Sequence, residues 1–150
     1  MVENISARHQ LPLLATGQAQ KEVTHNEALI RIDALLHPVV EAELATPPTI
    51  TAGTQEGKCW LIANAASGEW LGHGGKIAYW TGGSWRLLTS VDGMFLRNKM
   101  LGIDLFRTPS GWIAPTAIAN PAGGGVIDAE ARTALNTLLT QLRLTGVIAT

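Results

Sequence analysis

The spacing of apolar residues predicts an α-helix in the N-terminal third of the chain. Thr24 and Glu27 have the form of a capping box, in which each side chain bonds the other residue's backbone amide at the start of a helix. Pro38 would end this helix, because the residue before a proline disfavours helical geometry. Residues 17–22 could extend the helix upstream or form a separate turn. The apolar face expected for this helix is Ala28, Leu29, Ile32, Leu35 and Leu36.

The middle of the chain changes to short strand-like runs separated by turns. These runs lie at residues 58–63, 76–80, 85–89, 94–99, 103–107 and 112–114. Gly82 and Gly83 join two of them and favour a tight hairpin, because glycine readily adopts positive φ. No connection in this region is long enough for a helical crossover, so we expect a small antiparallel meander of about five to seven strands.

The last region contains a second predicted helix behind a glycine-rich linker. Asp128 is placed to cap this helix, Glu130 suits the positive end of its dipole, and Gly146 supplies a C-terminal stop. The expected apolar face of this helix is Ala131, Leu135, Leu138, Leu139 and Leu142. A single helix of this length is marginal in water, so the face should pack on the β-region or on a partner chain.

Together these patterns predict an α+β fold: an N-terminal helix, a β-meander, and a C-terminal helix after a Gly-rich linker. We expect a helical oligomerisation segment at 1–48, a Trp/Gly-rich β-domain at 49–120, and the linker with its amphipathic helix at 121–150. Charged residues make up only 15% of the chain, against about 25% in an average domain. A chain so poor in charge should hide apolar surface against another copy, which predicts a homo-oligomer.

Two arrangements of the helical faces stay open at this point. The first helix could pack against its symmetry mates, or its apolar face could cover the chain's own sheet. The residues expected at an oligomer interface are Leu29, Ile32, Leu36, Leu135, Leu138 and Leu142. In the first arrangement Gln18, Gln20 and Asn26 would set the register between chains by hydrogen bonds, although they could equally serve as turn and cap residues.

Charge and leader patterns exclude several classes of partner. The net charge is −1 and the 11 cationic residues are scattered, so nucleic-acid binding is not expected. No apolar run approaches the roughly 18 residues of a membrane span, and the first residues lack the basic and apolar stretches of a signal peptide. Cys59 is the single cysteine, which fits a reducing compartment. We therefore expect synthesis in the cytoplasm and no membrane partner.

Catalytic and cofactor signatures are absent from the sequence. Lys76 follows two glycines as in a phosphate-binding loop, but Ile77 stands where Ser or Thr would hold magnesium. The four histidines are too far apart for helical metal spacing, and no serine lies in a nucleophile elbow. No cofactor, metal or catalytic residue is therefore expected. The alternative is a glycan hydrolase, in which Glu69, Asp92 and Asp104 would converge in the β-domain.

The five tryptophans all fall between positions 60 and 112. They could form the core of the sheet, or some could form a sugar-binding surface, because an indole face packs against pyranose C–H bonds. Strand alternation places Ile77 and Tyr79 on one face and Ala78 and Trp80 on the other. The candidate glycan-binding residues are Trp70, His73, Trp80 and Trp85.

One segment is similar to a known family. The run GQAQK at 17–21, followed by VTHNEAL at 23–29, resembles the opening motif of a domain-of-unknown-function family (DUF2793-like) found in alphaproteobacterial prophages and gene transfer agents. The Gly/Trp-rich segments at 68–73 and 78–85 and the closing helix after Asp128 are also similar to such proteins. The resemblance carries no catalytic residues.

The resemblance implies a non-enzymatic component of a phage-like particle, such as a tail fibre or spike that attaches to a cell surface. Because fibres are commonly trimers, a homotrimer is favoured, with other particle proteins and a cell-surface polysaccharide as further partners. The alternatives are the hydrolase above, acting as a depolymerase, and a structural adaptor that joins two particle components.

Overall fold

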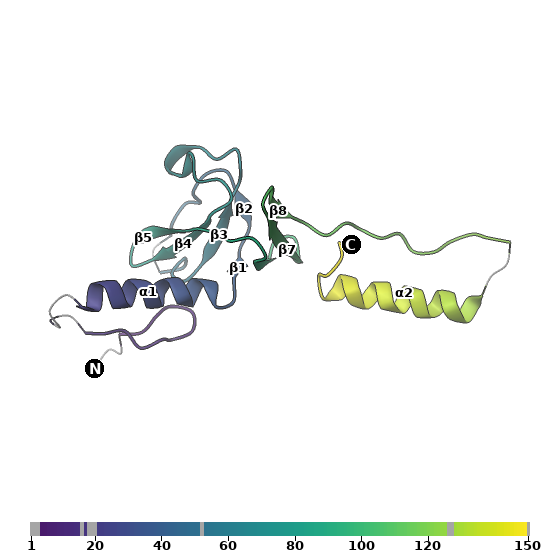
Figure 1. Ribbon diagram of the computed structural model, residues 1–150, viewed down its shortest axis with the longest axis horizontal. Coiled ribbons are helices and arrows are strands. Elements are labelled where there is room, and N and C mark those ends of the chain that lie inside the picture. The colour runs from purple at the N-terminus through teal and green to yellow at the C-terminus, as the bar shows by residue number, and fades with distance from the viewer. Residues whose placement is uncertain (1–3, 16, 18–20, 52, 126–127, 150) are drawn as a thin grey trace.

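The computed structural model describes residues 4–15, 17, 21–51, 53–125 and 128–149. Within these residues two α-helices and eight strands form an α+β fold with a helix towards each end, as predicted (Figure 1). In chain order the elements are α1 (Lys21–Leu35), β1 (Val39–Val40), β2 (Glu43–Leu44), β3 (Cys59–Ile62), the 3₁₀ turn η1 (Gly68–Trp70), β4 (Ile77–Thr81), β5 (Ser84–Leu88), β6 (Phe95–Asn98), β7 (Ile103–Thr108), β8 (Gly111–Ile113) and α2 (Ala129–Leu144).

The strands form two four-stranded sheets rather than one meander. Their orders are β2-β3-β4-β5 and β1-β6-β7-β8. The connections β3-β4-β5 and β6-β7-β8 are antiparallel, as expected, but β1 pairs parallel with β6 and β2 pairs parallel with β3. The expectation of a purely antiparallel sheet was wrong at these two edges. The loop at 45–58 contains no helix in its described part, yet it is long enough to return the chain to the start of a parallel strand.

The short segment that carries β1 and β2 joins the two sheets. The carbonyl of Val40 accepts a hydrogen bond from the amide of Lys99 at 3.0 Å, which ties the segment to the end of β6. One residue later, the amide of Glu41 donates to the carbonyl of Cys59 at 2.8 Å, which ties it to β3. Because this segment precedes residue 48, the β-structure begins before the expected start of the β-domain.

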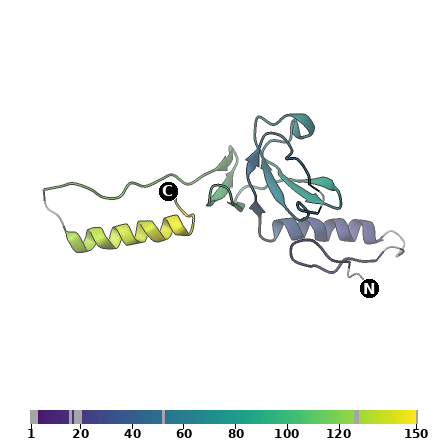
Figure 2. The ribbon, with the colours of Figure 1, turned by 180° about the vertical axis from the view of Figure 1, so that it is seen from behind.

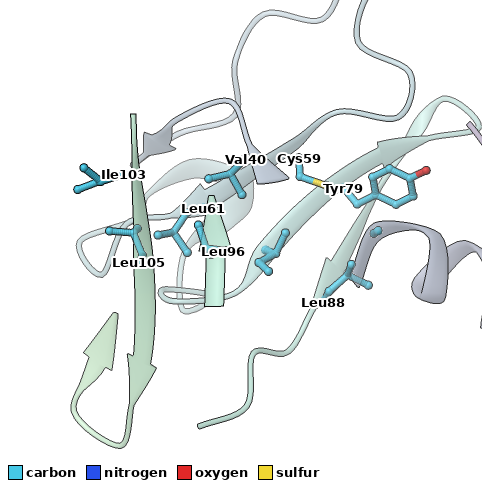
Figure 3. Packing of buried hydrophobic residues seen from close by; sticks show 10 residues of the cluster. Val40, Cys59, Leu61, Tyr79, Leu88, Leu96, Ile103 and Leu105 are labelled. Carbon is cyan, nitrogen blue, oxygen red and sulfur yellow. The ribbon is translucent and has the colours of Figure 1, made fainter. Parts of the chain in front are cut away.

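The main core lies between the two sheets and α1 (Figure 3). It consists of Ala34, Val40, Cys59, Leu61, Ile77, Tyr79, Leu88, Leu96, Ile103 and Leu105. A second apolar cluster covers the opposite face of the β2-β3-β4-β5 sheet and contains Ala78 and Trp80. The predicted alternation along β4 is confirmed, because Ile77 and Tyr79 face the main core.

Helix α1 buries a different face from the one predicted. Asp33 and Ala34 are fully buried, whereas Ile32 and Leu36 are 48% and 64% exposed. The predicted capping box at Thr24 is also wrong, because the helix already includes Lys21. The hydroxyl of Thr24 donates to the carbonyl of Lys21 at 3.4 Å instead of capping the helix. Helical periodicity alone missed the buried face because that face contains an ionisable residue.

The buried carboxylate of Asp33 binds the N-terminal segment to α1. It accepts hydrogen bonds from the amide of Arg8 at 3.0 Å, the amide of His9 at 2.7 Å and the hydroxyl of Tyr79 at 2.9 Å. Burial by itself raises the pKa of Asp33. Hydrogen bonds, including one from Ser6, outweigh burial and hold this pKa below its ordinary value of 3.8.

Asn26 of α1 also binds the N-terminal segment, through two hydrogen bonds to the backbone of Leu14. Its side-chain oxygen accepts from the amide of Leu14 and its side-chain nitrogen donates to the carbonyl of Leu14, both at 2.9 Å. The amide group thus pairs with the backbone much as a neighbouring strand would. Asn26 therefore bonds within its own chain, and Gln18 and Gln20 lie outside the described residues.

The C-terminal part forms an arm that extends away from the sheets (Figures 1 and 2). Helix α2 begins as predicted, because the carboxylate of Asp128 accepts from the amide of Ala131 at 2.8 Å. Gly146 follows the helix with a φ of +74°, as expected of a C-terminal stop. The extended strap at 114–125 runs beside α2, and Arg143 binds the carbonyl of Ile118 and the side chain of Asn120.

Candidate functional site

Four tryptophans form an edge-to-face cluster on the β2-β3-β4-β5 sheet, on the face away from the main core. Trp85 lies at its centre. Its ring centroid is 5.4 Å from that of Trp60, 5.2 Å from that of Trp70 and 4.9 Å from that of Trp80. The corresponding interplanar angles of 83°, 77° and 66° are those that aromatic quadrupoles favour.

The four indoles of this cluster differ in burial, and they form a buried pair and a half-buried outer pair. Trp60 and Trp70 are 5% and 1% exposed, whereas Trp80 and Trp85 are half-buried. Trp80 and Trp85 are direct cross-strand partners in the β4–β5 hairpin. The two-residue turn of that hairpin has positive φ at both Gly82 and Gly83, as the sequence predicted. The two outer indoles are therefore held in place from below and from the side.

The outer indoles line an open groove of about 720 Å³, within the size range of small-molecule sites. Its walls come from three parts of the chain: the loop after β2, the turn η1, and the β4–β5 hairpin. The lining residues are Pro47, Pro48, Ile50, Gly68, Glu69, Trp80, Gly83, Ser84 and Trp85. Most of these are apolar or small, and a few polar groups stand among them, as in a typical ligand site.

One side chain gives the groove its charge. Glu69 is exposed, and among the described lining residues it is the only charged one. The hydroxyl of Ser84 is bonded to the guanidinium of Arg86 at 2.6 Å, and Arg86 in turn bonds Glu27 of α1, so this hydroxyl lies on the sheet face opposite Trp85. The groove therefore offers an anionic acceptor beside two indole faces.

The loop that carries Glu69 is fixed by close backbone contacts. The amide of Ser67 donates to the carbonyl of Ala45 at 2.9 Å, and Gly68 has a φ of +62°, which favours glycine. Gly74 approaches Asn64 so closely that an added Cβ would lie 2.9 Å from its Cα. These contacts direct Glu69 outward and Trp70 inward.

The comparison with protein families gives one match. The family described as "protein of unknown function (DUF2793)" matches residues 25–113, more than half of the chain. The chain belongs to the DUF2793 family. No curated protein and no solved structure matches it. The matched part runs from within α1 to the last residue of β8, so it contains all four clustered indoles and leaves the α2 arm outside.

The DUF2793 region brings together some of the predicted glycan-binding residues and separates others. Trp80 and Trp85 line the groove, while Trp70 lies beneath Trp85 and is too deeply buried to contact a ligand. His73 is not among the lining residues. Its Nδ1 lies 3.3 Å from the Nζ of Lys76. No periodic pattern indicated Pro47, Pro48 and Ile50, because they lie in the irregular loop between β2 and β3.

The three carboxylates considered for hydrolysis do not meet in this DUF2793 domain. Asp104 pairs with Arg97 at 3.2 Å, and Asp92 lies 3.9 Å from Arg107. Both pairs belong to the β6-β7-β8 side, whereas Glu69 lies on the groove of the other sheet.

The described part of the chain holds no cluster of three or more His, Cys, Asp or Glu side chains that could bind a metal ion. Burial raises the pKa of the Cys59 thiol to about 12, although the nearby Arg8 lowers it somewhat, so this thiol stays protonated and unreactive. Among the described residues, neither helix has the length and apolar character needed to cross a bilayer.

Proposed function

We propose that this DUF2793 protein is a non-enzymatic component of a phage-like particle, a tail fibre or spike, whose groove binds a unit of cell-surface glycan. The observation that carries the binding role is the Trp80–Trp85 pair, half-exposed in the groove and supported by two buried indoles. An indole face packs well on the C–H surface of a pyranose, and rigid support lowers the entropy lost on binding. The particle context rests on what the family resemblance implies.

The distribution of carboxylates favours binding over hydrolysis. A glycosidase holds two carboxyl groups about 5–10 Å apart across the scissile bond. Among the described residues that line the groove, Glu69 is the single carboxylate. A lone carboxylate beside two indoles suits recognition of sugar hydroxyls better than acid–base catalysis.

Sugar binding is expected to depend on Trp80. In a titration of the full chain with glycans selected from an array, Trp80→Ala should weaken affinity at least tenfold, because the variant loses one of two stacking faces. Trp112→Phe is the matched control, because Trp112 lies away from the groove and its Nε1 donates to the carbonyl of Gly75 at 2.9 Å. Thermal unfolding of each variant confirms folding. A wild-type chain that binds no arrayed sugar, or an unchanged affinity for Trp80→Ala, would contradict the proposal.

We also propose that copies of this chain associate through α2, with a trimer favoured. All 16 residues of α2 lie in the described part of the chain, and none is buried. Leu135 and Leu138 are 51% and 53% exposed, and Leu142 is half-buried. With Ala131 they follow the alternating four- and three-residue spacing of a coiled-coil seam. Since an isolated helix of this length is marginal, a second copy is the partner that would stabilise it.

The expected α1 interface has less support than the α2 seam. Leu29 is half-buried, and of the residues expected here only Ile32 on α1 and Leu36, which directly follows α1, are exposed. Helix α1 is already anchored to the main core through Ile30, Ala34 and Leu35. It therefore needs no second copy for its stability.

Light scattering is expected to give a mass that is a multiple of 15.9 kDa. The double variant Leu135→Gln with Leu138→Gln should shift the protein towards monomer, because it places polar amides in the seam. Val23→Gln serves as the control, since Val23 is an exposed apolar residue on α1. A monomeric wild-type chain would disprove self-association, and equal effects of both changes would disprove the assignment to α2.

A further inference from the structure

We infer that Glu69 selects the charge of the ligand, so that the groove accepts uncharged pyranose units and rejects acidic ones such as uronic and sialic acids. This inference rests on the proposed function of the same groove. It adds the class of sugar and names the residue that determines it.

The first support is that the carboxylate of Glu69 lacks the bonds that three other glutamates near the β-sheets make. Glu27 bonds Arg31 and Arg86, Glu41 bonds Lys99, and Glu56 accepts hydrogen bonds from the Thr81 hydroxyl and the Gly82 amide. Glu69 has no ion-pair or hydrogen-bond partner among the residues that the structure describes. Its carboxylate oxygens are free to accept from a ligand.

The second support is the fixed position of the Glu69 backbone. Glu69 stands in η1 directly before Trp70, whose indole is 1% exposed and packs under Trp85. A displacement of this backbone would therefore disturb the buried indoles. Because Glu69 lines the same groove as Trp80 and Trp85, its carboxylate can accept hydroxyl hydrogens from a pyranose stacked on them.

The third support is the absence of a compensating cation in the lining. Among the described lining residues no Lys, Arg or His accompanies Glu69, and the nearest basic residue along the hairpin, Arg86, is bonded to Glu27 and Ser84. An acidic sugar in this groove would bring its carboxylate next to an unneutralised negative charge. Like charges at such separations repel, and salt screens this repulsion where the groove is open to water.

The test compares matched neutral and acidic probes on the full chain, such as lactose with sialyllactose, and glucose oligomers with glucuronate oligomers. Wild-type protein should bind the neutral member of a pair at least tenfold more tightly than the acidic member, and added salt should narrow the difference. Glu69→Gln removes the charge and keeps the shape, so it should reduce the preference to about threefold or less and abolish its salt dependence. Glu130→Gln, which removes an equal charge from α2, should leave the preference unchanged.

The outcomes separate this inference from the proposed function. If no neutral or acidic glycan binds wild-type protein, the glycan-binding function fails, and the inference fails with it. If a glycan binds and Trp80→Ala abolishes binding, but Glu69→Gln leaves the preference unchanged or acidic probes bind more tightly, the inference alone is wrong.

Discussion

Asp33→Asn is expected to lower the free energy of unfolding by about 3 kcal/mol, one of the largest effects available to a single polar substitution in this chain. The buried carboxylate accepts from the amides of Arg8 and His9 and from the hydroxyl of Tyr79. An asparagine keeps the volume but turns an amide donor towards groups that are themselves donors. Chemical denaturation monitored by tryptophan fluorescence measures the loss.

The same substitution should release the N-terminal segment from α1. Trypsin should cleave after Arg8 faster in Asp33→Asn than in wild type, because the backbone at Arg8 and His9 loses its acceptor. Asp104→Asn is the matched control, since Asp104 forms a 3.2 Å ion pair with Arg97 but is 42% exposed. Exposed pairs contribute about 1 kcal/mol or less, so a similar loss in both variants would disprove the special role of Asp33.

The hydrogen bonds of Asp33 should also make the free energy of unfolding depend on pH in the acid range. Burial raises the pKa of Asp33, but hydrogen bonds hold it below 3.8 in the folded state. A depressed pKa stabilises the fold above the unfolded-state pKa, and this stability is lost as the pH falls through the folded-state value. Wild type should therefore lose stability below about pH 4, while Asp33→Asn should lose less over the same interval. Parallel pH curves for the two proteins would contradict this account.

Trp70→Ala is expected to lower the free energy of unfolding by about 3–5 kcal/mol, because it removes a fully buried indole and leaves a cavity under Trp85. Glycan affinity should fall as well, although Trp70 touches no ligand, since Trp85 loses its support. Trp80→Ala should lose less stability than Trp70→Ala, because Trp80 is only half-buried. Its glycan affinity should fall directly, through the loss of a stacking face. Denaturation and sugar titration of both variants, measured in parallel, provide the test.

Trp70→Phe is the control that measures how much of the packing needs the second ring of the indole. The indole nitrogen of Trp70 is buried, and within the described residues it has no hydrogen-bond partner. Phenylalanine removes this unpaired donor while retaining one aromatic ring, so the cost should be only about 1 kcal/mol. A loss as large as that of Trp70→Ala would show that a single aromatic ring cannot support Trp85.

The features that the sequence determined by itself depend on neighbours along the chain. The β4–β5 hairpin follows from Gly82 and Gly83, because a two-residue turn with positive φ suits few other residues. The Asp128 cap and the end of α1 before Pro38 likewise follow from local backbone chemistry. Period-two alternation placed Tyr79 and Trp80 on opposite faces of one strand.

Only the tertiary structure decided which face of α1 is buried and where the groove lies. Periodicity predicted an apolar stripe through Ile32, but the helix buries Asp33, since backbone amides far upstream satisfy that carboxylate. The parallel pairs that β1 and β2 form likewise join segments distant in sequence. The groove does the same, because Pro47 and Trp85 both line it. Such contacts depend on which donors and surfaces the folded chain brings together, and no local propensity encodes that.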